Sequence, residues 1–178
     1  MKTERKPSPP PLILPQTMSA VAAAAREEEF MAVDPGERNW AYAKYTKARG
    51  FFEFDVLDLK GIKGDPATKM RHLHETGLFD SATVLLLERQ MKSQFKEQVT
   101  AVRAWHWHKT RLVAPHSVKR HFKTSTGKHS TNKKAHVALA RSLLTTADER
   151  ARFQRHKKKD DVADCICMVS WYLHTQCD

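Results

Sequence analysis

The chain has 178 residues, 40% of them hydrophobic, and a formal net charge of +11 at neutral pH. This length suits one domain with a tail, and the apolar content is too high for a wholly disordered chain. No stretch approaches the ~18 consecutive apolar residues of a membrane span, so no membrane association is expected. The positive charge predicts a polyanionic partner rather than a small-molecule substrate, although net charge says nothing about fold.

The charge is unevenly distributed along the chain. Residues 1–100 hold 15 lysines and arginines against 14 acids, whereas residues 101–159 hold 16 against 2 and include seven of the ten histidines. Residues 160–178 contain four acids and no lysine or arginine. This order favours a site where cations hold a nucleic acid against carboxylates. A basic face that only keeps the protein soluble is the simpler alternative.

The beginning of the chain has the composition of a tail. Five of the eight prolines lie within residues 7–15, and an alanine run and a charged block follow. We therefore expect a disordered Pro/Ala-rich tail over residues 1–28 and a single domain over residues 29–178. A mitochondrial targeting segment fits less well, because such segments are arginine-rich and poor in acids. Met18 is an alternative start.

Three cysteines, Cys165, Cys167 and Cys177, lie near the C-terminus. An odd number of cysteines in a lysine-rich chain without a secretory signal is typical of a reduced, intracellular protein.

Three strands are predicted in the first part of the domain, by the runs EFMAV, NWAYAKY and FFEFDVLDL with turns between them. The first run ends at Asp34, and Pro35 and Gly36 then form a tight turn. A strand would fix this carboxylate, and the glycine would let a ligand approach the backbone. An aspartate that merely opens a turn is the plainer interpretation.

A helix over DPATKMRHLHETGLFD, with Gly77 as its stop, and a buried strand over SATVLLLERQ are predicted next. The strand ends in Glu88, directly after four apolar residues. Burial of this carboxylate would be costly unless it is paired or holds a metal. The alternative is a glutamate that simply emerges into solvent.

A further helix is predicted from Gln90 to about His108 by positions at i, i+4, i+7 and i+11, namely Phe95, Val99, Val102 and His106. His106 and His108 do not predict a zinc site, because residues two apart point to different sides of a helix. For Trp105 and Trp107 we expect packing roles.

The following segments are a short strand, TRLVAP, a helix starting at HSVKRHF, an exposed cationic loop, KTSTGKHSTNKK, and a clear helix, NKKAHVALARSLL. The last segment, KKKDDVADCICMVSWYL, is predicted to be a helix that begins with carboxylates. Its apolar stripe is Val162, Cys165, Ile166 and Val169. Acids in a first turn offset the helix dipole, which is the simpler reason for Asp160, Asp161 and Asp164. Asp161 and Asp164 also share a helical face, as do Asp160 and Asp164.

The order of the elements is strand, strand, strand, helix, strand, helix, strand, helices. This is the order of the α/β RNase H-like fold, a mixed five-stranded sheet flanked by helices. In that fold the first and fourth strands are neighbours and the last helix packs across them. Asp34 and Glu88 would then face Asp161 and Asp164 across a small gap.

Five motifs in this order, VDPGERN, LLLERQ, VAPHSVKRHF, NKKA and KKDDVAD, resemble those of the Holliday junction resolvases of large DNA viruses, notably the poxvirus type. These enzymes are similar to the bacterial RuvC nucleases and the yeast mitochondrial resolvases. The resemblance covers residues 29–174. It implies four metal-binding, catalytic carboxylates, which are Asp34, Glu88, Asp161 and Asp164, with Asp161 preferred to Asp160 as the first of the helix pair. It also implies functional lysines, and we assign catalytic roles to Lys119 and Lys134.

The resemblance implies a structure-selective endonuclease that resolves four-way DNA junctions with two Mg²⁺ ions per active site, for which Mn²⁺ can substitute. Phosphate contacts are expected from a basic set: Lys119, Arg120, Lys128, Lys133, Lys134, Lys157 and Lys158. A homodimer is implied, with FKEQVTAVRAWHWH as the candidate interface. If the protein is viral, we expect it in the replication compartment of the host cell. Two alternatives stay open: an RNase H-like nuclease for RNA–DNA hybrids or flaps, and a non-catalytic DNA-binding module.

Overall fold

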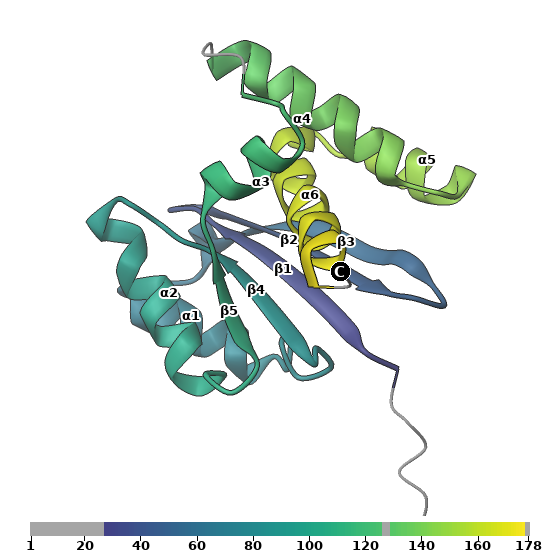
Figure 1. The fold of residues 1–178 in the computed structure, drawn as a ribbon. Helices are drawn as coiled ribbons and strands as arrows, with labels where there is room; N and C mark the ends of the chain where they lie inside the picture. Colours follow the sequence, from purple (N-terminus) through teal and green to yellow (C-terminus); the bar gives the residue numbers. More distant parts are fainter. Residues whose placement is uncertain (1–26, 126–128, 177–178) are drawn as a thin grey trace, which may run out of the picture.

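The computed structural model describes residues 27–125 and 129–176, which form layers of helices around one sheet (Figure 1). The strands are β1 (Glu29–Pro35), β2 (Asn39–Thr46), β3 (Gly50–Asp58), β4 (Val84–Glu88) and β5 (Thr110–Val113). The helices are α1 (Pro66–Glu75), α2 (Ser93–Trp105), α3 (Pro115–His121), α4 (His129–Leu143), α5 (Ala147–Arg155) and α6 (Lys159–Gln176), with a 3₁₀ turn, η1 (Leu59–Gly61). Most of the predicted tail, together with Lys128 and Cys177, lies outside the described residues.

The sheet has the strand order β3-β2-β1-β4-β5. The first three strands pair antiparallel as a meander, while β1 with β4 and β4 with β5 pair parallel. The predicted mixed five-stranded sheet, with the first and fourth strands as neighbours, is therefore confirmed. None of the helices within the described ranges has the length and apolar character needed to cross a membrane.

Side-chain alternation along the strands sorts the core into two halves. On β1, Phe30 and Ala32 pack on the side of α6, whereas Met31 and Val33 pack on the opposite side with residues of α1 and α2. In Figure 1 α6 lies across the near face of the sheet, and α1 and α2 cover the far face. Because strand residues alternate between faces, every even-numbered residue of β1 points toward α6.

Small side chains let α6 approach the sheet closely. Ala32 pairs with Ala43 across β1 and β2, and Asp34 pairs with Ala41. Over these alanines α6 is buried on nearly all sides, at Val162, Ala163 and every residue from Cys165 to Ser170. The predicted stripe of four residues is correct but too narrow, because α4 covers the outer side of α6 as the sheet covers the inner side.

Two predicted boundaries are wrong. The helix expected to reach His108 ends at Trp105, because His106 turns inward and is buried beside Phe79. The predicted loop over residues 123–134 is helical from His129 onward. The first residues of α4 are largely exposed and polar, so hydrophobic periodicity does not reveal them. The short helix α5 was not predicted.

One buried carboxylate, Glu149, fastens α5 to the edge strand β3. Its oxygens accept hydrogen bonds from the backbone N–H groups of Phe51, Thr145 and Thr146, each at 2.7 Å. Burial acts to raise the pKa of Glu149, but these donors outweigh it and hold the pKa below its usual value. Arg152 adds bonds to the carbonyls of Phe51 and Phe52.

We expect Glu149→Ala to lower the free energy of unfolding by about 3 kcal/mol, because it leaves several buried N–H groups unpaired. Urea titration at neutral pH measures this loss. Asp148→Ala is the matched control, since it removes an exposed acid from the same helical turn and should cost less than about 1 kcal/mol. Equal losses in the two variants would show that the buried bonds contribute nothing special.

Candidate active site

Asp34 and Glu88 lie at the C-terminal ends of two neighbouring parallel strands, on the same face of the sheet. Strand alternation puts Asp34 on the side of Ala32, and Glu88 on the side of Leu86, both under α6. The paired positions of β1 and β4 run up to Val33 and Leu87, so the two carboxylates stand one step beyond the last pair. Sheet register alone therefore brings together two acids that are 54 residues apart in sequence.

The side-chain amide of Gln90 lies between these two carboxylates. Its Nε2 donates to Glu88 Oε1 at 3.2 Å and to Asp34 Oδ1 at 3.4 Å. Both acids thus direct an oxygen at one electropositive group. Sequence reasoning missed Gln90; the available signal was its place two residues after a carboxylate that ends a buried strand.

The N-terminal turns of α6 supply the other two predicted carboxylates. The negative charges of Asp161 and Asp164 both act on Asp34, and that of Asp164 also acts on Glu88. Asp161 and Asp34 line one hollow of about 350 Å³, together with Lys158 and the β1–β2 turn. A Cβ on Gly36 in that turn would lie 2.5 Å from the carbonyl oxygen of Asn39, so the turn itself requires glycine.

Asp160 points to a different side from Asp161. Its Oδ2 accepts a hydrogen bond from Lys133 Nζ. Burial acts to raise the pKa of Asp160, but this bond outweighs burial and leaves the pKa below its usual value. Asp160 lines a separate groove between α4 and the start of α6. The structure therefore brings Asp161, and not Asp160, beside Asp34.

The negative charge of the four acids is only partly compensated by the lysines beside them. Burial raises the pKa of Asp34 well above its usual range, and the charges of Glu88, Asp164 and Asp161 raise it further. Burial, followed in size by the negative charge of Asp164, raises the pKa of Glu88 to about 7. Burial and then Asp160 raise the pKa of Asp161. Such a cluster is unfavourable without a cation, which makes it a candidate metal site.

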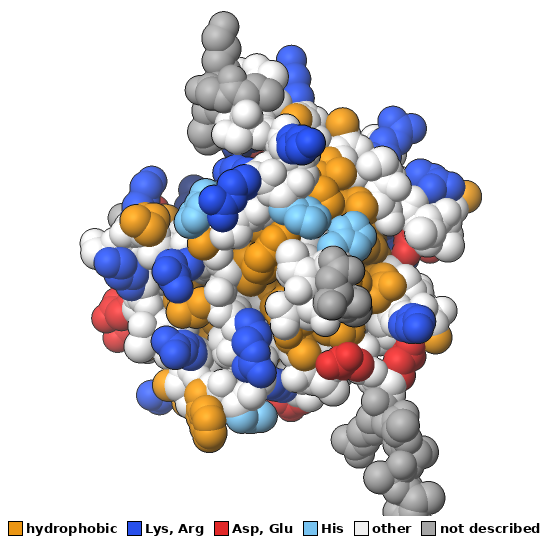
Figure 2. Space-filling view, viewed as in Figure 1, with side chains coloured by type: hydrophobic (Ala, Val, Ile, Leu, Met, Phe, Trp, Pro, Cys, Tyr) orange, Lys and Arg blue, Asp and Glu red, His pale blue; other side chains and the backbone are white. Residues whose placement is uncertain are grey.

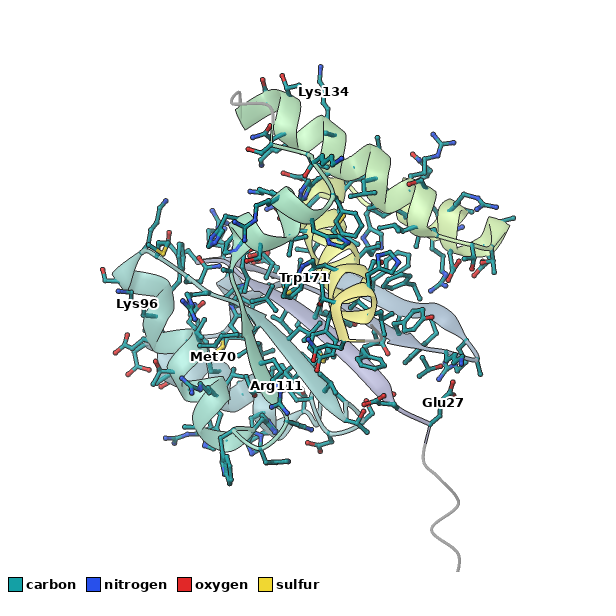
Figure 3. All side chains as sticks on the ribbon, in the orientation of Figure 1. Glu27, Met70, Lys96, Arg111, Lys134 and Trp171 are labelled. Carbon is teal, nitrogen blue, oxygen red and sulfur yellow. The ribbon has the colours of Figure 1, made fainter. Side chains whose placement is uncertain are left out.

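Lys119 lies beside Glu88 and Asp164. Half-buried on α3, it lines two small cavities with Asp164 and His136, and its charge lowers the pKa of Asp34 and Glu88 against the effects that raise them. Lys134 instead extends from α4 into solvent, as Figure 3 shows. Of the two lysines with predicted catalytic roles, Lys119 has the better position; both roles stay predictions.

The remaining predicted DNA contacts lie around the site rather than in it. Lys133, Lys134 and Lys157 line the groove of about 650 Å³ between α4 and the start of α6, together with Arg141 and Lys159. Lys158 lines the hollow beside Asp34, and Arg120 is exposed on α3. Lysine and arginine side chains are spread over the upper and left parts of the face in Figure 2. Lys128 lies outside the described residues.

A buried histidine on α4, His136, contacts Asp164 of α6. Its Nδ1 lies 2.5 Å from Asp164 Oδ1, and its Nε2 lies 2.8 Å from Thr124 Oγ1. Sequence reasoning missed His136, because its apolar helical neighbours hide it. The signal available was its spacing of three residues from Lys133, which puts both on one helical face.

The donor set fits a hard divalent cation. The four acids offer only oxygen atoms, which Mg²⁺ and Mn²⁺ prefer. The neighbouring Cys165 thiol is buried, and burial raises its pKa well above the usual value, which disfavours a thiolate ligand there. Over residues 27–125 and 129–176, no three histidine, cysteine or acidic side chains are drawn together tightly enough to form a finished metal site.

The fold is similar to those of solved junction resolvases. The fowlpox virus resolvase in complex with Holliday junction DNA has 17% sequence identity and a TM-score of 0.65, over 84% of this chain and 99% of that chain. A second structure, of the fowlpox virus Holliday junction resolvase, has 17% sequence identity and a TM-score of 0.62, over 83% of this chain and 98% of that chain. T. thermophilus RuvC in complex with a Holliday junction substrate has 11% sequence identity and a TM-score of 0.54, over 84% of this chain and 96% of that chain. The predicted RNase H-like fold is confirmed.

Sequence comparison identifies the family. No curated protein matches the chain by sequence. The family model described as Poxvirus A22 protein matches residues 29–175, which is the whole predicted domain except its last three residues. The predicted resemblance to the poxvirus type is thereby confirmed, and the chain belongs to the Poxvirus A22 protein family.

Proposed function

We propose that this chain is a Holliday junction resolvase, a metal-dependent endonuclease that cuts four-way DNA junctions by phosphodiester hydrolysis. The observation that carries the proposal is the convergence of four carboxylates from β1, β4 and α6. Support comes from the family and from a fold similar to that of the fowlpox virus resolvase, whose structure includes its Holliday junction substrate.

Asp34, Glu88, Asp161 and Asp164 would hold the metal, and we expect two Mg²⁺ ions, with Mn²⁺ as a substitute. When bound, such ions provide an activated water and stabilise the leaving oxygen of a phosphodiester. The fold holds these four acids in fixed positions, because Asp34 and Glu88 lie on strands and the other two acids lie on a buried helix.

The cations next to the carboxylates would orient the DNA strand to be cut. On one side, the hollow that contains Asp34 and Asp161 also contains Arg38 and Lys158. On the other side, a cavity of about 90 Å³ joins Asp164 to Lys119 and Lys133. A strand that crosses the carboxylates therefore meets positive side chains before and after the reacting phosphate. Such contacts position DNA without reading its sequence.

A homodimer is the expected active form. One chain carries one set of four carboxylates, whereas resolution of a two-fold symmetric junction needs two nicks. The candidate interface is the segment FKEQVTAVRAWHWH, which comprises most of α2 and the turn after it, where Trp105 is 36% exposed and Trp107 73% exposed. Trp105 stacks on His74, with ring centroids 5.1 Å apart, so it already has one partner within the chain, and Trp107 is the better candidate for contact with a second copy.

For catalysis, we expect Asp34→Asn and Glu88→Gln to reduce junction cleavage by more than about 100-fold, because each removes a metal ligand rather than an outer-shell partner. Junction affinity, measured in Ca²⁺ or chelator, should change little, since lysines and arginines bind the phosphates. Asp160→Asn is the matched control beside Asp161→Asn. A larger loss in Asp160→Asn than in Asp161→Asn would contradict the site geometry.

The same assay distinguishes the nuclease classes. Wild-type protein with Mg²⁺ should cut a four-way junction and leave a linear duplex and an RNA–DNA hybrid of matched sequence largely intact. Preferential cleavage of the hybrid would favour the alternative RNase H-like activity. Junction binding without any Mg²⁺-dependent cleavage would favour a non-catalytic module.

For pH, the raised pKa of Glu88, about 7 against an ordinary 4.5, sets a direction for stability. The metal-free fold binds the proton more tightly than the unfolded chain does, so the stabilisation is complete below about 4.5 and is lost as pH rises through about 7. Without metal, the melting temperature of the wild-type protein, measured relative to that of Glu88→Gln at each pH, should fall between about pH 4.5 and about pH 7. Excess Mg²⁺ should abolish the fall. Parallel curves for the two proteins would refute this assignment.

For assembly, we expect coordinated paired nicking of a supercoiled plasmid that extrudes a cruciform. A dimer converts it to linear DNA within one binding event, whereas a monomer accumulates nicked circles. Trp107→Ala should shift sedimentation toward the monomer and raise the nicked fraction. Asp148→Ala is the control, because the Asp148 side chain is 75% exposed on α5, which lies away from α2 (Figure 1). A monomeric mass together with mainly nicked product would defeat the dimer model.

A further inference from the structure

His136 uses both ring nitrogens inside the protein, although its side chain is almost completely buried. The residue is 3% exposed, with Nδ1 at Asp164 Oδ1 and Nε2 at Thr124 Oγ1. A buried polar ring costs free energy unless it is hydrogen-bonded, and an apolar side chain would fill the same space without that cost. The two polar contacts therefore call for an explanation beyond packing.

The contact continues from Thr124 to the helix that carries Lys119. The backbone N–H of Thr124 donates to the carbonyl oxygen of Lys119 at 3.0 Å, and Thr124 Oγ1 lies 3.4 Å from the same oxygen. Thr124 is buried, directly after Lys123, whose φ of 54° turns the chain back. Asp164, His136, Thr124 and Lys119 thus form one chain of contacts across α6, α4 and the end of α3.

Proton accounting restricts how this chain works. An ionised Asp164 only accepts hydrogen bonds, so the ring must donate through Nδ1–H. Nε2 then either accepts the Thr124 hydroxyl proton or donates to that hydroxyl, whose own proton is directed at the Lys119 carbonyl. In both arrangements the imidazole occupies Oδ1 of Asp164, so a cation would bind through the other oxygen.

We propose that His136 is a positioning residue: its imidazole orients Asp164 for metal binding and ties that carboxylate to the helix of Lys119. A histidine that fixes a ligating carboxylate from behind acts as an outer-shell partner, whose loss typically lowers metal affinity by about 10–100-fold. The inference rests on the proposed function only in taking Asp164 as a metal ligand.

The test measures Mn²⁺ binding to the full chain without DNA, from the loss of the free-ion signal in electron paramagnetic resonance. His136→Ala should weaken Mn²⁺ affinity by about 10–100-fold. His136→Asn should recover part of it, because its amide N–H lies near the position of Nδ1–H. Thr124→Val should weaken affinity less than His136→Ala, and Thr124→Ser should retain it.

His106→Ala is the matched control. His106 is also buried, at 5% exposure, and contacts His74 through its ring, but it lies at the other end of the sheet and on the opposite face. The His106→Ala substitution should lower the melting temperature of the protein without changing its Mn²⁺ affinity. If His136→Ala does not fold, His136→Asn and Thr124→Val decide the matter through the same titration.

The proposal is overturned if folded His136→Ala binds Mn²⁺ as wild type does, if His106→Ala weakens binding equally, or if wild-type protein binds no Mn²⁺. Failure of the proposed function gives a different pattern. In that case Mn²⁺ affinity still depends on His136, but no Mg²⁺- or Mn²⁺-dependent cleavage of a four-way junction is seen.

Discussion

Repulsion among four carboxylates at one end of the sheet is the constraint on which the rest of the structure depends. Asp34 and Glu88 end adjacent parallel strands, and α6 brings Asp161 and Asp164 over them. The raised pKa values of Asp34, Glu88 and Asp161 show that this arrangement works against the fold when no cation is present. Other interactions must therefore hold the acids together.

The packing of α6 provides most of that stabilisation. Nearly its whole central part is buried between the alanines of β1 and β2 on one side and α4 on the other. Polar contacts complete the site: Gln90 bridges the two strand acids, and Lys119 supplies a positive charge beside them. The apolar helix and the charged site are thus one unit, since the burial that holds α6 in place also desolvates the carboxylates and raises the pKa values of Asp34, Glu88 and Asp161.

The sequence was sufficient for the sheet and for the positions of the acids, because both follow from short-range patterns. Alternation along β1 and β4 predicts which face Asp34 and Glu88 occupy, and a spacing of three predicts the shared face of Asp161 and Asp164. The preference for Asp161 over Asp160 came from the resemblance, but its physical basis appears only in the structure, since it depends on Lys133, 27 residues from Asp160. His136 and Glu149 were missed for the same reason: their decisive partners lie 28 and 98 residues away. The loop predicted over residues 123–134 failed because the exposed start of α4 has no apolar periodicity.

The central claim is that the four carboxylates form a divalent-metal site. The most direct measurement is an anomalous difference map from crystals of the wild-type protein soaked in Mn²⁺. The account predicts density within coordination distance, roughly 2.0–2.2 Å, of Asp34 and Glu88, with Asp161 or Asp164 completing the ligand set and Asp160 left on Lys133. Mn²⁺ density only at Asp160 or elsewhere on the surface, with Gln90 still between Asp34 and Glu88, would contradict it.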